Sequence, residues 1–390
     1  MIDALLSEFY EALYGRPLTE PDDAQDVENI LTCIRVGRGI PDDGDDDQLR
    51  EAGLEKIRMT FGIMARNSRN SLAVLTKIKL YDNPFRFFYE LLQNADDARY
   101  VQCVDDPTIK FIVSQTELIV DLNEDGFSLL DVLAICSIGE SSKTLDQNST
   151  GDKGFGFKSI FGVTDKVHIT SGMWSFRFQH QREEDGIGMI QPYWEPGEQL
   201  PEDVRTRFRL RLSFSENDGL ETLCAQMRHL QPSIMFALRR IKKLSVRFEL
   251  GPAGNGTLSF EKSVDMDGDI MTIVSRKDAQ AEKHFYRVFN EEASDMPRHV
   301  ERTETTSNVT IGLPISAQND GSPLLSETGQ FVFAFLPIVQ IRELPFLVHA
   351  DFILTDSRQA ISDNAWNKAL RNKIAALFCT LANRLALEKK

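Results

Sequence analysis

The sequence predicts an α+β protein in which helices precede a mixed, mostly antiparallel sheet. Apolar residues recur at helical spacing from Asn83 to Tyr100. Two short apolar runs then follow, at 109–113 and 118–122, and only the four residues Ser-Gln-Thr-Glu separate them, as in a hairpin. The chain has 390 residues, 42% of them hydrophobic and 26% charged, which is the composition of a globular protein. That length predicts two or three domains.

The remaining elements are expected in order along the chain. A helical pattern at 53–79 precedes the first helix described above. Strands are expected on both sides of the turn Ser171-Gly172 and in the alternating run at 207–212, followed by a helix at 220–242 and a strand at 244–250. Later elements are strands at 270–274, 309–314, 330–336 and 346–354 and a last helix at 366–387.

The segment from Gly251 to Gly256 predicts a domain boundary, because three glycines and a proline interrupt every apolar period there. We therefore expect an N-terminal extension at 1–50, with an acidic loop from Pro41 to Asp47. A first domain at 51–250 and a second, smaller domain at 251–390 complete the prediction.

Charge and composition exclude several classes of protein. The chain has 44 Lys and Arg against 59 Asp and Glu, a net charge of -15, and its short basic run at 239–243 does not offset this charge. Nucleic acid is therefore not an expected partner. No run approaches the roughly 18 apolar residues of a membrane span, so no membrane partner is expected. The start lacks the features of a signal peptide, which predicts an intracellular protein, cytoplasmic or nuclear.

The stretch from Glu90 to Ala98 is the most informative part of the sequence. Glu90, Asn94 and Asp97 are spaced by four and then three residues, so they share one face of a helix. Such a stripe is typical either of a solvated face of an amphipathic helix or of a polar site.

A second informative stretch runs from Gly151 to Ser159. Closely spaced glycines ahead of a helix expose backbone N–H groups that can cradle phosphate, although they are equally typical of a flexible turn. The P-loop pattern is not met, because Phe157 separates Gly156 from Lys158. The Rossmann pattern GxGxxG is also absent.

Together, these stretches resemble two boxes of the GHKL superfamily, which includes gyrase, heat shock protein 90, histidine kinases and MutL. The turn from Asn123 to Ser128, with the run at 138–143, is similar to the sacsin and NO VEIN branch, whose N-terminal modules are heat shock protein 90-like. The resemblance covers about 50–390. It implies a Bergerat-fold α/β sandwich, with helices packed on one face of a mixed sheet, followed by a second, smaller α/β domain like the start of a chaperone middle domain.

The resemblance also implies roles for residues. Glu90 would deprotonate the attacking water, and Asn94 would hold Mg²⁺. Arg358 would reach the γ-phosphate from the second domain. Further nucleotide-binding positions are Asp97 and Ala98, the lid residues Ser142 and Lys143, the glycine-box residues Gly151, Lys153, Gly154, Phe155, Gly156 and Phe157, and Thr206, which would reach the adenine through water.

The sequence departs from the superfamily in its middle box. Of the pattern D-x-G-x-G, only Gly126 is present here, and Phe127 follows it. The residues that could accept a hydrogen bond from the adenine amino group are Glu124, Asp125 or, as a neutral substitute, Asn123. A hydrogen-bond acceptor is needed there because that amino group donates.

The function implied is Mg-dependent binding of ATP and slow hydrolysis to ADP and phosphate, driving a lid and domain switch with a chaperone-like role. Protein clients or self-association would be its partners besides nucleotide. The alternative is a module that senses ATP without hydrolysing it. A histidine kinase is disfavoured, because all six histidines follow Glu90 and none is available on a preceding helix.

Overall fold

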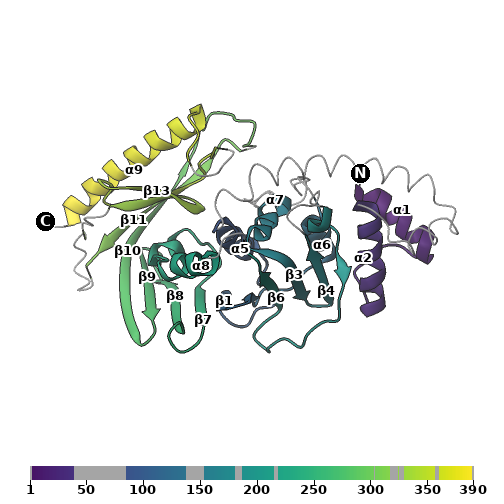
Figure 1. Ribbon diagram of the computed structural model, residues 1–390. Helices are drawn as coiled ribbons and strands as arrows, with labels where there is room; N and C mark the ends of the chain where they lie inside the picture. The colour runs from purple at the N-terminus through teal and green to yellow at the C-terminus, as the bar shows by residue number, and fades with distance from the viewer. Residues whose placement is uncertain are drawn as a thin grey trace. The chain divides into compact units, whose positions relative to one another are not determined.

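The computed structural model describes residues 2–38, 85–137, 153–180, 187–214, 218–302, 304–316, 324, 329–355 and 360–388 (Figure 1). The expected helix at 53–79 lies outside these residues. The chain forms two compact units, one of Met1–Arg228 with Ser245–Gly256 and one of His229–Leu244 with Thr257–Lys390. Within the described ranges, no helix has the length and apolar character needed to cross a membrane.

Most strands of the first unit's sheet pair antiparallel. The predicted hairpin is confirmed, because Ile109 and Leu122 lie opposite each other on its two strands. The strands are, in spatial order, β7 (Lys243–Glu249), β1 (Thr108–Ser114), β2 (Glu117–Leu122), β6 (Thr206–Leu212), β3 (Thr164–Ser171), β4 (Trp174–Gln179) and β5 (Tyr193–Trp194). The turn expected at Ser171-Gly172 is also confirmed, and Gly172 takes a φ of +58° there.

Helix α5 (Arg86–Asp97) packs on this sheet through aromatic side chains. The rings of Phe88 on α5 and Phe111 on β1 lie 4.6 Å apart between centroids, and both side chains are completely buried. The predicted helix within 83–100 is therefore confirmed. Helix α5 also packs against α7 (Lys153–Lys158) and the 3₁₀ helix η1 (Ser159–Gly162). This packing brings the stretches at 90–98 and 151–159, which are about sixty residues apart in the sequence, into contact.

Two helices in the N-terminal extension were not predicted. Helix α1 (Ile2–Tyr14) and helix α2 (Ala24–Arg38) bury Phe9 and Ile34 completely or nearly so. Helix α2 packs beside β5, where the guanidinium of Arg35 lies 5.1 Å from the centre of the Tyr193 ring. The extension is therefore part of the first unit rather than a separate tail.

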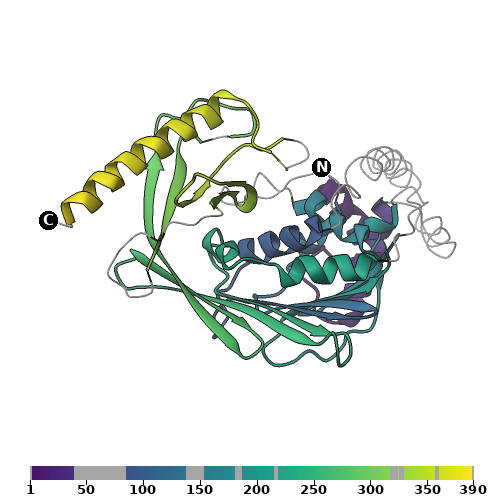
Figure 2. The same cartoon turned by 60° about the vertical axis from the view of Figure 1, so that its left-hand side comes forward.

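The second unit consists of a strongly bent sheet with one long helix. Its strands are β8 (Gly256–Val264), β9 (Ile270–Lys277), β10 (Gln280–Ala293), β11 (Ser307–Ile315), β12 (Gln330–Ala334), β13 (Leu336–Ile341) and β14 (Leu347–Ala350). Helix α9 (Ala365–Glu388), yellow in Figure 2, packs against β11 and β10 of its unit. Trp366, Leu370 and Leu377 of this helix share a core with Ile311 of β11 and Val348 of β14.

The predicted fold class is wrong. The described strands form one 14-stranded sheet, ordered β13-β12-β14-β11-β10-β9-β8-β7-β1-β2-β6-β3-β4-β5, instead of a helix-covered sandwich followed by a separate sheet. The segment at 251–256 is the turn between the neighbouring strands β7 and β8. Gly251 takes a φ of +94° there and its carbonyl accepts hydrogen bonds from the N–H groups of Gly254 and Asn255. A cluster of glycines predicts a turn, but it does not show whether the strands on its two sides pair.

The helix expected at 220–242 is also shorter than predicted. Helix α8 (Gly219–Arg228) has ten residues, and the 3₁₀ helix η3 (Pro232–Phe236) follows it. Pro232 lacks a backbone N–H and cannot continue an α-helix, which explains the break.

The packing of α5 gives a direct test of the first unit's core. Replacing Phe88 by alanine should lower the free energy of unfolding by about 3–5 kcal/mol, because the completely buried ring leaves a cavity against Phe111. Urea unfolding of the whole chain measures this change. The exposed Val104→Ala variant should stay within about 0.5 kcal/mol of the wild type. A Phe88→Ala variant as stable as the wild type would show that α5 does not pack as described.

Candidate functional site

Glu90 is a buried carboxylate on α5 with an arginine as counter-charge. It is 4% exposed, and its Oε1 lies 3.2 Å from Nε of Arg86, one helical turn earlier. Burying a carboxylate without a partner is costly, so this pair is an important element of the site. The sequence analysis missed Arg86 because the resembling box begins at Glu90. The spacing of four residues between opposite charges was the signal that could have identified it.

The other predicted residues of α5 lie toward its C-terminal end. Asn94 and Asp97 are half-buried, and the helix ends at Asp97. Ala98 is half-buried as well and has extended backbone angles, φ −66° and ψ 168°. Glu90 and Asn94 are therefore one turn apart on the same helix, as the sequence predicted, with only Glu90 fully buried.

Gly156 of α7 lies directly against Glu90. A Cβ atom built on Gly156 would be 2.0 Å from Glu90 Oε2 and 2.8 Å from its Cδ, so a side chain at 156 would require the carboxylate to shift. The glycine-rich stretch at 151–159 therefore contacts the Glu90 carboxylate. Its glycines at 154 and 156 lie within a short helix and not in a loop before it. Lys153 and Phe155 belong to the same helix. The predicted residues Ser142, Lys143, Gly151 and Arg358 lie outside the described residues.

The residues after Gly156 anchor α7 to the core. Phe157 is 2% exposed and packs against Phe178 and Phe208, with ring centroids 6.2 and 6.0 Å away, so its side chain belongs to the core. Lys158 is also buried. Its Nζ donates to the carbonyl of Ile135, the last residue of α6 (Leu129–Ile135), and to that of Met189, at 2.7 Å, in η2 (Ile187–Met189). These bonds hold α7 against α6.

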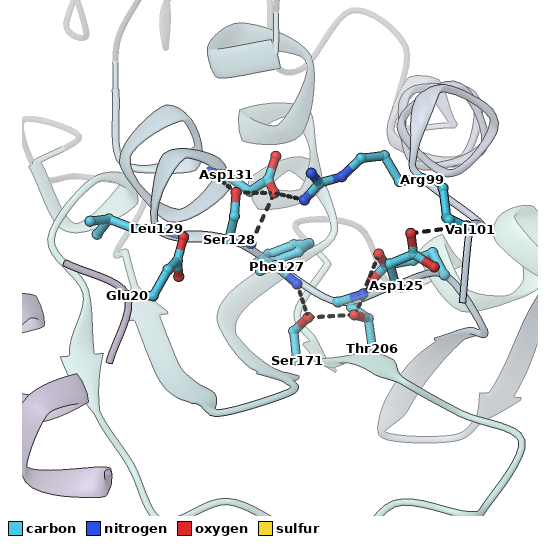
Figure 3. A network of polar contacts seen from close by, with 12 residues as sticks. Glu20, Arg99, Val101, Asp125, Phe127, Ser128, Leu129, Asp131, Ser171 and Thr206 are labelled. Atoms are coloured by element: carbon cyan, nitrogen blue, oxygen red, sulfur yellow. Dashed lines mark hydrogen bonds and ion pairs between the residues drawn. The ribbon is translucent and has the colours of Figure 1, made fainter. Parts of the chain in front are cut away.

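The three candidate acceptors in the turn after β2 have different hydrogen-bond partners, and Figure 3 labels Asp125 among them. The amide of Asn123 is bonded to the backbone of the 106–108 segment. Asp125 accepts from the N–H groups of Val101, at 3.0 Å, and Gln102, at 2.7 Å. Glu124 instead is 6% exposed and accepts from the Thr206 hydroxyl with one oxygen and from the Gly126 N–H, at 2.7 Å, with the other.

Ser171 completes this polar group, and the sequence analysis missed it. Ser171 and Thr206 are both completely buried and lie directly opposite each other on β3 and β6. Their hydroxyl oxygens are 2.5 Å apart, and Ser171 Oγ also accepts from the Phe127 N–H at 2.8 Å. The sequence indicated only a turn at Ser171, because strand pairing across the sheet is not visible in a local pattern.

The turn is fixed at its far end by the start of α6 (Figure 3). Ser128 caps this helix and forms a capping box with Asp131, which lies 3.9 Å from an Nη atom of Arg99. The carboxylate of Glu20, from the N-terminal extension, accepts from the Leu129 N–H at 3.0 Å. Contacts with α6, the extension and β3 therefore hold the turn that carries Glu124.

Comparison with known proteins places this site within a matched region. Residues 73–240 match the family model of the Sacsin domain. The chain is also 29% identical over 361 residues to Protein NO VEIN of Arabidopsis thaliana. This alignment covers 84% of the chain but 13% of NO VEIN, so the chain corresponds to a small part of that relative. Both findings support the sacsin and NO VEIN-like resemblance expected from the sequence.

Burial raises the pKa of Glu124, which lies within the region that matches the Sacsin domain. Desolvation raises the pKa of this carboxyl group above its ordinary value, and the negative charges of Asp131 and Asp125 act in the same direction. The hydrogen bonds from Thr206 and Gly126 oppose the shift, since they favour the charged form. Glu124 should therefore take up a proton at a higher pH than an exposed glutamate does.

The contact between Gly156 and Glu90 gives the second prediction. Gly156→Ala should lower the free energy of unfolding by about 1–3 kcal/mol, because the new methyl group must displace the buried carboxylate. Urea unfolding measures the effect. In a background of Glu90→Ala, which opens the space, the same substitution should cost much less. An equal cost in both backgrounds would mean that the two residues are not in contact.

Proposed function

We propose that this chain binds Mg-ATP and hydrolyses it slowly, with Glu90 as the general base. The observation that carries the proposal is the contact of Gly156 with Glu90, which brings the two GHKL-like stretches, 90–98 and 151–159, together. The match to the Sacsin domain and the sequence resemblance to GHKL ATPases support the same function.

The adenine end of the nucleotide would lie at Glu124 and Thr206. Each carboxylate oxygen of Glu124 accepts one hydrogen bond from the protein, and a carboxylate has about four acceptor sites in all. Acceptor capacity is therefore left for an amino group of the base. Asn123 and Asp125 are bonded to the backbone of the 101–108 segment, which favours Glu124 for this role.

The phosphate end would lie beside α7 and α5. Gly156 lets the backbone of α7 approach the Glu90 carboxylate of α5, so the reacting phosphate would lie near both helices. Among the described residues no group of three or more His, Cys, Asp or Glu side chains could hold a metal ion. The half-buried amide of Asn94 fits Mg²⁺, because an amide oxygen is a hard ligand and this ion keeps most of its positions for phosphate and water. Bound Mg²⁺ would neutralise phosphate charge.

Glu90 would accept a proton from the attacking water. Arg86 pairs with this buried carboxylate and fixes one of its oxygens, so the group is held in one orientation on α5. Arg358, as the cation acting from the second unit, and Ser142 and Lys143, as lid residues, stay predictions from the resemblance, since they lie outside the described residues.

A nucleotide-dependent conformational switch with a sacsin-like, chaperone-like role is the biological output that we propose. The alternative is an ATP-sensing module without hydrolysis. The middle box favours this alternative, because its carboxylates at 124 and 125 depart from the superfamily pattern D-x-G-x-G while the glycine box is kept.

Replacing Glu90 by glutamine separates the two functions. The variant should bind Mg-ATP within about threefold of the wild type while its phosphate release falls by about 10²–10⁴-fold, the usual contribution of a general base. Binding is measured by calorimetry and hydrolysis by phosphate release. Binding by both proteins without any phosphate release would favour the ATP-sensing module. Undiminished release by Glu90→Gln would contradict the role of Glu90.

The raised pKa of Glu124 predicts a pH dependence of binding. As the pH falls, the carboxyl group gains a proton and loses acceptor capacity, so the affinity for ATP should decline. Because the pKa is raised, the decline should begin above the pH at which an exposed glutamate, with a pKa of about 4.3, would titrate. Calorimetric titrations between about pH 8 and 5 measure it. Glu124→Gln should lose this dependence, and an equally steep decline in that variant would assign the titration to another group.

A further inference from the structure

A continuous chain of hydrogen bonds joins the Phe127 N–H to the buried side chains of Ser171, Thr206 and Glu124. The Phe127 N–H donates to Ser171 Oγ at 2.8 Å, and Ser171 Oγ lies 2.5 Å from Thr206 Oγ1. The Thr206 hydroxyl bonds to Glu124 Oε1. The chain therefore begins at a backbone donor and ends at a carboxylate, with two hydroxyl groups between them.

The two ends fix the direction of every hydrogen bond in the chain. An ionised carboxylate can only accept, so Thr206 gives its single proton to Glu124. Ser171 must then be the donor in the bond to Thr206, since Thr206 has no second proton. The backbone N–H of Phe127 can only donate, which is consistent with Ser171 accepting there. Each hydroxyl group thus accepts from one neighbour and donates to the next.

This order determines what the site offers to a ligand. The remaining capacity of Glu124 and of Thr206 Oγ1 consists of lone pairs, because the protons of Ser171 and Thr206 are already used. A base edge that carries an amino group matches these acceptors. A carbonyl oxygen at the same position would face lone pairs, and it could gain a proton from Thr206 only by taking that proton from Glu124.

We infer that Ser171 is a specificity-determining residue of the proposed nucleotide site and favours a purine with a 6-amino group over one with a 6-carbonyl group. Ser171 acts through Thr206, by holding the Thr206 proton on Glu124. The inference rests on the proposed binding of ATP. Beyond ATP binding, the inference assigns to Ser171 the control of which groups at the site donate and which accept hydrogen bonds. Ser171 lies 35 positions before Thr206, on a different strand.

Inosine triphosphate is the matched probe, because it differs from ATP by a carbonyl group at ring position 6 and a proton on the adjacent nitrogen. Dissociation constants of the Mg²⁺ complexes of both nucleotides are measured by calorimetry for the wild-type chain, Ser171→Ala and Ser171→Cys. Ser175→Ala serves as the control, since Ser175 is also a buried sheet serine but bonds to His168, at 3.1 Å, and not to Thr206.

The wild type should prefer ATP by about tenfold or more, which corresponds to one or two hydrogen bonds. Ser171→Ala should reduce this preference by about fivefold, the value of one hydrogen bond of about 1 kcal/mol. Ser171→Cys keeps the shape of the side chain with a weaker donor and should give an intermediate ratio. Ser175→Ala should keep the wild-type ratio.

The outcomes separate this inference from the function on which it rests. If the wild type binds ATP without preference over inosine triphosphate, or if both Ser171 variants keep the wild-type ratio, the inference is overturned while ATP binding stands. If the wild type binds neither nucleotide, the proposed function is overturned, and the inference falls with it. Ser171→Cys supplies the answer where Ser171→Ala does not fold.

Discussion

The close approach of α7 to α5 at Gly156 and Glu90 is the constraint on which the candidate site depends. A side chain at 156 would have to displace Glu90, because even a methyl carbon would be 2.0 Å from the carboxylate oxygen. The carboxylate in turn requires a counter-charge, which Arg86 supplies from the preceding turn. Glycine lowers the stability of the α7 helix, but at 156 it allows contact with Glu90 without displacing the buried carboxylate.

A second polar group is built by the sheet. Ser171 and Thr206 lie opposite each other because β3 and β6 pair in an antiparallel register, and the turn after β2 brings Glu124 to them. The same sheet supports α5 through the contact of Phe88 with Phe111. One framework of strands therefore holds both polar groups, which is how residues from distant parts of the sequence become parts of one candidate site.

Local features of the fold could be predicted from the sequence, whereas its long-range pairing could not. The amphipathic period predicted α5, and two short apolar runs separated by four residues predicted the β1–β2 hairpin, since both depend on side chains that are close in sequence. The expected sandwich was wrong because the described strands form one sheet, in which β7 and β8 are neighbours. No local pattern encodes that pairing.

The same limit applies to the candidate site. The predicted carboxylate Glu90 and glycine Gly156 do come together, because the boxes that contain them are visible as short motifs. Arg86 was not predicted because it lies just before the motif that begins at Glu90. Ser171 was not predicted because only strand pairing brings it to the site. The sequence left three acceptors open in the middle box, and burial beside Thr206 favours Glu124 among them.

Hydrogen–deuterium exchange with and without saturating Mg-ATP tests the account most directly, because it locates a nucleotide without relying on turnover. The account predicts slower exchange at the backbone amides of Gly126 and Phe127 and in α7, residues 153–158, where the two ends of the nucleotide would lie. Bound nucleotide that leaves the exchange of both segments unchanged would contradict the account.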